Sequence, residues 1–133
     1  MKKLLVLILS LGFLLATSAK AETVLYCQSE LATGFSKNSG AWKEVSFKKE
    51  RFTIKFNSNY SRLEGISYDS MDCKAPYPHM EDIIFCVQSN YNYSTLRYNK
   101  KTRRFVHYFN PSGGYVGSST DTDILYAGTC KAF

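Results

Sequence analysis

Few residues in this sequence have the types and spacing that metal binding requires. Histidine occurs only twice, as His79 in a proline-bearing segment and as His107 in a segment of alternating apolar residues. Neither has a ligand-like neighbour, and the sequence contains no His-x-x-x-His, no Cys-x-x-Cys and no Asp-rich calcium loop. We therefore expect no bound metal and no cofactor.

The signals for catalysis are equally sparse. The sequence has no Gly-x-Ser-x-Gly elbow of the kind that presents a nucleophilic serine. Asp121 and Asp123 are two residues apart and would share one face of a strand, as paired carboxylates of glycosidases sometimes do. We interpret them instead as the solvated start of a strand that continues at Ile124. The protein is therefore expected not to be an enzyme, with a small secreted hydrolase as the alternative.

Basic side chains gather in two predicted turns. One holds Lys48, Lys49 and Arg51. The other, which we call the basic tip, holds Lys100, Lys101, Arg103 and Arg104. If both turns lay at one end of the molecule, they would form a positive rim suited to lipopolysaccharide, anionic lipid or an acidic protein. The alternative is that charge only keeps hairpin tips solvated and discourages association of strand edges.

Aromatic side chains are abundant, with ten tyrosines, nine phenylalanines and Trp42 as the single tryptophan. Core packing and cross-strand pairing account for most of these rings. Rings near predicted turns, or alternating with polar residues, are candidates for a surface that contacts sugar or protein. These candidates are Tyr60, Tyr68, Tyr77, Tyr91, Tyr93, Tyr98 and Tyr115.

The N-terminal segment has the pattern of a cleaved signal peptide. A charged start precedes an apolar run over residues 4–16, which ends before the Ala19-Lys20-Ala21 order that signal peptidase recognises. We expect cleavage after Ala21, in preference to a buried or membrane-anchoring helix, and a single domain over residues 22–133. Three of the 17 basic residues lie in the signal, so the mature charge falls from +6 to +3. Nucleic acid is not an expected partner.

All four cysteines, Cys27, Cys73, Cys86 and Cys130, lie in the mature part, and export would place them in an oxidising compartment. Two disulfides are therefore expected, although three pairings are open. We favour the pairing of Cys27 with Cys130, which would tie the first strand to the last, and of Cys73 with Cys86.

The mature chain reads as β structure throughout. The clearest strand is 51–56, where Phe52, Ile54 and Phe56 would face the core. Residues 23–27 and 83–87 are predicted to be more fully buried strands, 94–109 a hairpin whose turn begins at Asn99, and 123–130 the last strand. Close turn signals predict an all-β, antiparallel meander of seven or eight strands, closed or nearly closed as a small barrel, with a β-sandwich as the alternative.

The mature sequence resembles a group of small exported proteins of Gram-negative, often marine, bacteria and their phages. The similarity rests on three segments: Leu25, Tyr26 and Cys27; Thr33, Gly34, Phe35, Gly40 and Trp42; and 126–131 with Phe133. It implies export and a β fold, and it supplies no functional residues because that group has no assigned activity. A fainter similarity, in size and cysteine placement only, is to periplasmic lysozyme inhibitors, whose inhibitory loop motif is absent from this sequence.

Together these features predict a periplasmic or secreted, monomeric, non-catalytic binding or inhibitor-type module. Its expected partner is an envelope protein, a glycan or an anionic lipid. A structural envelope protein is the remaining alternative.

Overall fold

The computed structural model describes residues 21–38, 40–66, 69–88, 90, 94–117 and 121–133. The expected signal peptide thus falls, up to residue 20, outside the described residues, as do Tyr68, Tyr91 and Tyr93. The described elements are β1 (Thr23–Asn38), β2 (Ala41–Ser46), β3 (Arg51–Phe56), β4 (Arg62–Glu64), β5 (Met71–Lys74), β6 (Ile83–Gln88), β7 (Ser94–Asn99), β8 (Arg104–Phe109), the short 3-10 turn η1 (Pro111–Gly113) and β9 (Asp123–Ala132). Among the described residues, no helix has the length and apolar character needed to cross a membrane.

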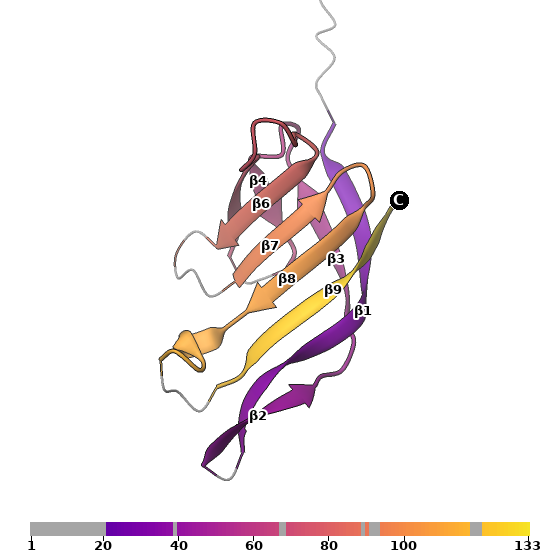
Figure 1. Cartoon of the computed structure of the whole chain (residues 1–133). Coiled ribbons are helices and arrows are strands. Elements are labelled where there is room, and N and C mark those ends of the chain that lie inside the picture. The colour runs from indigo at the N-terminus through magenta and orange to yellow at the C-terminus, as the bar shows by residue number, and fades with distance from the viewer. Residues whose placement is uncertain (1–20, 39, 67–68, 89, 91–93, 118–120) are drawn as a thin grey trace, which may run out of the picture.

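The strands form a closed antiparallel barrel with one additional strand (Figure 1). Their order is β2-β1-β3-β4-β5-β6-β7-β8-β9, and β9 pairs back onto β1 to close the sheet. Among the described residues, eight strands therefore make the barrel wall, while β2 pairs with β1 alone. The predicted all-β barrel is confirmed, and the sandwich alternative is excluded.

β1 is longer than the predicted strand 23–27 because it has two successive partners along one edge. Its first part, 23–28, pairs with β3, and its last part, 33–38, pairs with β2. The other edge pairs with β9, with a bulge between Ser29 and Leu31. Such a bulge bends a strand, and it lies where β1 changes partner from β3 to β2. The sequence does not reveal this extension, because residues 33–38, which pair with β2, have no core against which an apolar face could be buried.

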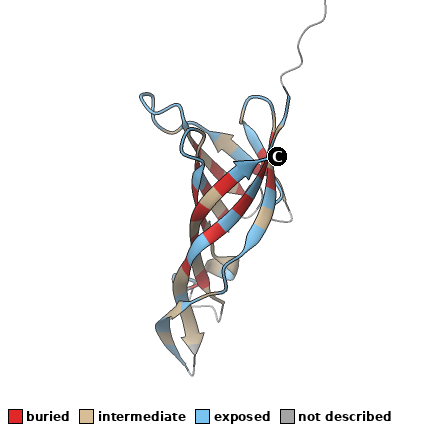
Figure 2. Ribbon diagram, turned by 90° about the vertical axis from the view of Figure 1, so that its right-hand side faces the viewer, coloured by how far each residue is buried: buried red, intermediate tan, exposed pale blue. Residues whose placement is uncertain are grey.

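Buried and exposed residues alternate along the barrel strands (Figure 2). In β3 the side chains of Ile54 and Phe56 are fully buried and Phe52 packs against the core, as predicted. The expectation that 23–27 would be a more fully buried strand was wrong, because Val24 and Tyr26 are 38% and 37% exposed. A barrel strand buries only the side chains that point inward, so its apolar outward residues meet solvent.

The barrel interior is filled by apolar side chains from every barrel strand. Nine of these side chains are Leu25, Ile54, Phe56, Leu63, Met71, Ile84, Leu96, Tyr98 and Phe105. A smaller group of buried polar side chains, Ser29, Gln88, Ser94, His107 and Asp123, accompanies them.

Two disulfides link directly opposed residues of neighbouring strands. Cys27 in β1 bonds to Cys130 in β9 across the seam that closes the barrel, and Cys73 in β5 bonds to Cys86 in β6. This is the pairing that the sequence favoured. Because such bonds persist where thiols are kept oxidised, the two bridges indicate an extracytoplasmic environment. At the same seam Gly128 has no side chain, and a Cβ there would clash with the Gln28 carbonyl oxygen.

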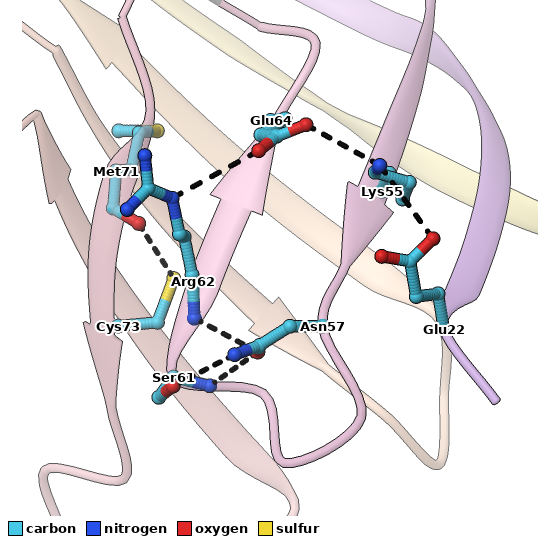
Figure 3. Close-up of polar contacts among 8 residues, drawn as sticks. All are labelled: Glu22, Lys55, Asn57, Ser61, Arg62, Glu64, Met71 and Cys73. Atoms are coloured by element: carbon cyan, nitrogen blue, oxygen red, sulfur yellow. Dashed lines mark hydrogen bonds and ion pairs between the residues drawn. The ribbon is translucent and has the colours of Figure 1, made fainter. Parts of the chain in front are cut away.

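Asparagine side chains fix two of the tight turns. Asn99 Oδ1 accepts hydrogen bonds of 2.9 Å from the backbone N–H groups of Lys101 and Thr102, so Asn99 begins its turn as predicted. Asn57 Oδ1 similarly accepts the N–H groups of Ser61 and Arg62 at 2.9 and 3.0 Å (Figure 3).

Candidate functional site

The basic tip caps the β7–β8 hairpin, but its four cations have different roles. Lys100 Nζ lies 5.3 Å from the centre of the Tyr60 ring, a cation–π contact that holds this side of the turn against the barrel. Lys101 and Arg103 are exposed in the turn itself. Arg104 is the first residue of β8, and it is exposed on the outer face because the next residue, Phe105, is buried.

The two basic turns do not form a single rim. β3 is antiparallel to β1, β1 to β9, and β9 to β8, so β3 and β8 run in opposite directions. The turn that precedes β3 and the turn that precedes β8 consequently extend in opposite directions along the barrel wall. The two turns therefore do not make the single positive rim that the sequence left open.

Strand register brings residues from both basic turns into one row on the outer barrel wall. Arg51 lies opposite Gln28, Gln28 opposite Thr129, and Thr129 opposite Arg104. Three strand spacings separate the two arginine backbones, which is about 15 Å. Lys131 follows two residues after Thr129 and is exposed on the same side of β9. We call Arg51, Arg104 and Lys131 the basic face.

A hollow of about 630 Å³ lies beside the basic face. It is lined by Gln28, Lys48, Lys49, Glu50 and Arg51. The Glu50 N–H donates a 2.6 Å hydrogen bond to Ser29 Oγ, which ties this loop to β1. Burial raises the pKa of the Tyr126 phenol, and the negative charge of Glu50 raises that pKa further. The Glu50 carboxylate is therefore close to Tyr126. The hollow is positive overall, because Lys48, Lys49 and Arg51 outnumber this one carboxylate.

Other cations of the barrel wall form ion pairs (Figure 3). Lys55 Nζ lies 3.5 Å from a Glu22 carboxylate oxygen and 3.4 Å from one of Glu64, while Arg62 Nε lies 3.8 Å from Glu64. Within the part of the chain that the structure describes, no ion pair involves the basic face. Its three positive charges are thus left for an external anion.

A buried Ser94–His107 pair is the nearest approach to a nucleophile and its base. The Ser94 hydroxyl and His107 Nε2 share a hydrogen bond of 2.7 Å, and the His107 ring stacks on Tyr126 with centroids 5.8 Å apart. Burial lowers the pKa of His107 to about 4. Ser94 is fully buried, so a substrate carbonyl group cannot reach its oxygen without opening the barrel. The geometry suits a structural link between β7 and β8.

Asp123 is not the solvated strand start that the sequence suggested. Its side chain is buried, and it accepts hydrogen bonds from the Tyr108 hydroxyl and from the Tyr115 backbone N–H. Asn110 Nδ2 in turn donates to the Tyr108 oxygen at 2.7 Å. A carboxylate that accepts two such bonds can remain buried as an anchor for the segment that follows β8.

An aromatic hollow lies where the β1–β2 hairpin meets the segment after η1. The Tyr115 ring centre lies 5.4 Å from that of Trp42, edge-on, and 6.3 Å from that of Phe35. The hollow has a volume of about 360 Å³ and is also lined by Lys43 and Glu44. Its volume is at the lower end of the range of small-ligand sites. We call these five residues the aromatic hollow.

The described candidate tyrosines differ in exposure. Tyr60 packs on Phe56 with ring centres 4.9 Å apart, and Tyr98 is buried in the core. Tyr77 and Tyr115 are exposed. The sequence does not single out Phe35 or Trp42, because only the pairing of β2 outside the barrel leaves their rings without a core to enter.

Comparisons of the chain with protein-family models, with curated proteins and with solved structures found no match. The resemblance to small exported proteins of Gram-negative bacteria and phages stays a prediction. Across the described residues, no cluster of three or more His, Cys, Asp or Glu side chains is arranged to hold a metal ion.

Proposed function

We propose that this protein is a non-catalytic binding module of the periplasm or the extracellular medium, and that it binds an anionic lipid surface through the basic face. The observation that supports the proposal is the strand register that aligns Arg51 with Arg104 across β1 and β9, with Lys131 beside them. Guanidinium groups recognise phosphate oxygens in a bidentate manner, and lysine adds a point charge.

The local charge favours an anion. The basic face and the adjoining Lys48 and Lys49 provide five positive charges. Two carboxylates lie nearby, and both have partners: Thr129 Oγ1 donates a 3.0 Å hydrogen bond to Glu30, and Glu50 lies close to Tyr126. An incoming phosphate group therefore meets a net positive surface.

The shape of the surface favours an array of anionic groups. The backbones of Arg51 and Arg104 lie about 15 Å apart on the outer wall of the barrel, so the two side chains can each meet a separate phosphate group. A row of lipid headgroups presents several phosphates over such a distance. An acidic protein is the competing partner, and vesicle binding separates the two.

Vesicle co-sedimentation tests the proposal. The oxidised protein should bind vesicles that contain anionic lipid and should not bind purely zwitterionic vesicles. The triple variant Arg51→Ser, Arg104→Ser, Lys131→Ser should weaken binding about a hundredfold, since each basic group near an anionic surface contributes about 1 kcal/mol. Raising the ionic strength should weaken binding by the wild type more than by the variant.

A matched control removes the same charge elsewhere. The variant Arg62→Ser, Lys74→Ser, Arg97→Ser takes three exposed cations from β4, β5 and β7. It should retain most of the binding. If both triple variants lost vesicle binding equally, net charge and not the basic face would determine binding. Absence of vesicle binding, together with specific capture of an acidic protein from envelope extract, would replace the lipid partner. Unchanged binding in the triple variant but loss after replacing the basic tip by serine would move the contact to the turn.

A further inference from the structure

We propose that the aromatic hollow is a second binding site, separate from the basic face, which takes a neutral saccharide. The inference does not depend on the anionic partner proposed above. The rings of this site, those of Phe35, Trp42 and Tyr115, come from two chain segments and meet on the surface.

Core packing does not explain these rings. Phe35 is 50% exposed and Tyr115 is 59% exposed. Of the strands that the structure describes, β2 pairs only with β1, so the hairpin that carries Phe35 and Trp42 extends beyond the barrel (Figure 1). Leaving two large rings half in water is unfavourable for an isolated domain, and exposed apolar patches of this kind commonly mark contact sites.

The rings are held in place by backbone anchors. The Tyr115 N–H donates a 2.6 Å hydrogen bond to the buried carboxylate of Asp123. Gly114 lies against that carboxylate, where a Cβ would clash, and Gly34 lets β1 approach the Asp123 backbone just before Phe35. Asp123 thus fixes both segments that supply the rings. A site organised before binding loses less conformational entropy when its ligand arrives.

The charges around the rings favour a neutral ligand with hydroxyl groups. Glu44 lies opposite Phe35 in the β1–β2 register, and Lys37 lies opposite Trp42. Glu44 lines the hollow, and Lys37 is the cation on the same face of the hairpin, since strand residues two positions apart point to the same side. A cation and an anion at the same site select neither sign of charge, but together they supply a donor and an acceptor, and a sugar hydroxyl can serve as either.

The shape of the rings completes the match. A pyranose ring has flat faces formed by C–H groups, which pack on aromatic side chains, and hydroxyls at its edge, which reach charged neighbours. A purely apolar side chain of a partner protein would cover Glu44 without giving its carboxylate a hydrogen-bond partner, which is unfavourable. The aromatic hollow therefore fits one sugar unit of a neutral glycan better than an apolar peptide.

Titration with maltohexaose, cellohexaose and fully N-acetylated chitohexaose tests the inference. Trp42 is the only tryptophan, so its fluorescence reports directly on the site. At least one of the three neutral glycans should change Trp42 emission in a saturable way. By calorimetry, Trp42→Ala and Tyr115→Ala should each weaken that binding about tenfold or more, because truncating an aromatic anchor commonly costs more than about 1 kcal/mol.

Matched variants make the outcome specific. Tyr77→Ala removes another exposed tyrosine in the segment between β5 and β6 and should leave glycan affinity unchanged. The basic-face triple variant should also bind glycan normally, whereas Tyr115→Ala should bind anionic vesicles normally. Circular dichroism should show the same fold for all variants.

Three results would overturn the inference. The first is the absence of saturable binding for all three neutral glycans. The second is equal loss of binding in Tyr77→Ala. The third is binding of a tryptophan-containing peptide or of polygalacturonate, a charged glycan, where the neutral glycans do not bind, since that would assign the hollow to an apolar or anionic ligand.

Discussion

The backbone N–H of Tyr115 donates a 2.6 Å hydrogen bond to the carboxylate of Asp123, which is buried at the first residue of β9. The other oxygen of this carboxylate accepts the Tyr108 hydroxyl. Burial raises the pKa of Tyr108, and its hydrogen bond to Asp123 raises it further, so the phenol remains a donor at neutral pH. One buried charge thus joins the barrel wall to the aromatic hollow.

Replacing this anchor should loosen the hollow. Asp123→Ala leaves the Tyr108 hydroxyl and the Tyr115 N–H without their acceptor, and the free energy of unfolding should fall by about 2 to 4 kcal/mol. Because Tyr115 contacts Trp42 edge-on, the emission of Trp42 should shift to longer wavelength in the folded variant. Tyr108→Phe removes one hydrogen bond and keeps the other, so it should cost less and leave the emission unchanged. Unaltered Trp42 emission in Asp123→Ala would show that the carboxylate does not position the ring.

His107 should make the protein less stable in mild acid. Burial lowers the pKa of His107 to about 4 in the folded protein, whereas an unfolded histidine has a pKa near 6.5. As the pH falls, the unfolded chain therefore binds the proton first. The stabilisation by neutral His107 is complete above pH 6.5 and is lost progressively between pH 6.5 and 4, a total of about 3 kcal/mol.

The measurement is urea unfolding at several pH values from 7 to 4, compared with His107→Gln, which does not titrate but can still bond to Ser94. Carboxylates affect both proteins, so the difference between the two curves isolates the histidine. The wild type should lose more stability than the variant over this interval. If the two curves of unfolding free energy against pH were parallel, the pKa of His107 would be the same in the folded and the unfolded protein.

The two disulfides should contribute unequally to stability. Their cysteines are 103 and 13 residues apart. In the chain-entropy model the longer loop contributes about 4.7 kcal/mol and the shorter about 3 kcal/mol. Replacing both Cys27 and Cys130 by serine should therefore destabilise the protein more than the same change at Cys73 and Cys86. Urea unfolding measures both. Peptide mapping without reduction should also recover Cys27 joined to Cys130, and a peptide that joins Cys27 to Cys73 or Cys86 would refute the pairing.

The sequence by itself determined the class of fold and much of its local structure. Alternation over 51–56 predicted which side chains of β3 face inward, since successive strand residues point to opposite sides. Asn99 marked a turn because its side chain satisfies the N–H groups that follow it. An even number of cysteines, two of them in the first and last strands, agreed with a barrel closed between those strands.

Only the tertiary structure decided which residues share a surface. Arg51 and Arg104 are 53 positions apart, and they align because strand register is set by the packing of the whole barrel. Asp123 looked like a solvated residue because the sequence does not show that Tyr108 and Tyr115 donate to it. The sequence did not separate Phe35 and Trp42 from the rings of the core for a similar reason. Alternation gives the face of a strand on which a ring lies, but whether that face meets a core or solvent depends on where the neighbouring strands end. No described strand besides β1 pairs with β2, and this leaves Phe35 half exposed beside Trp42 and Tyr115.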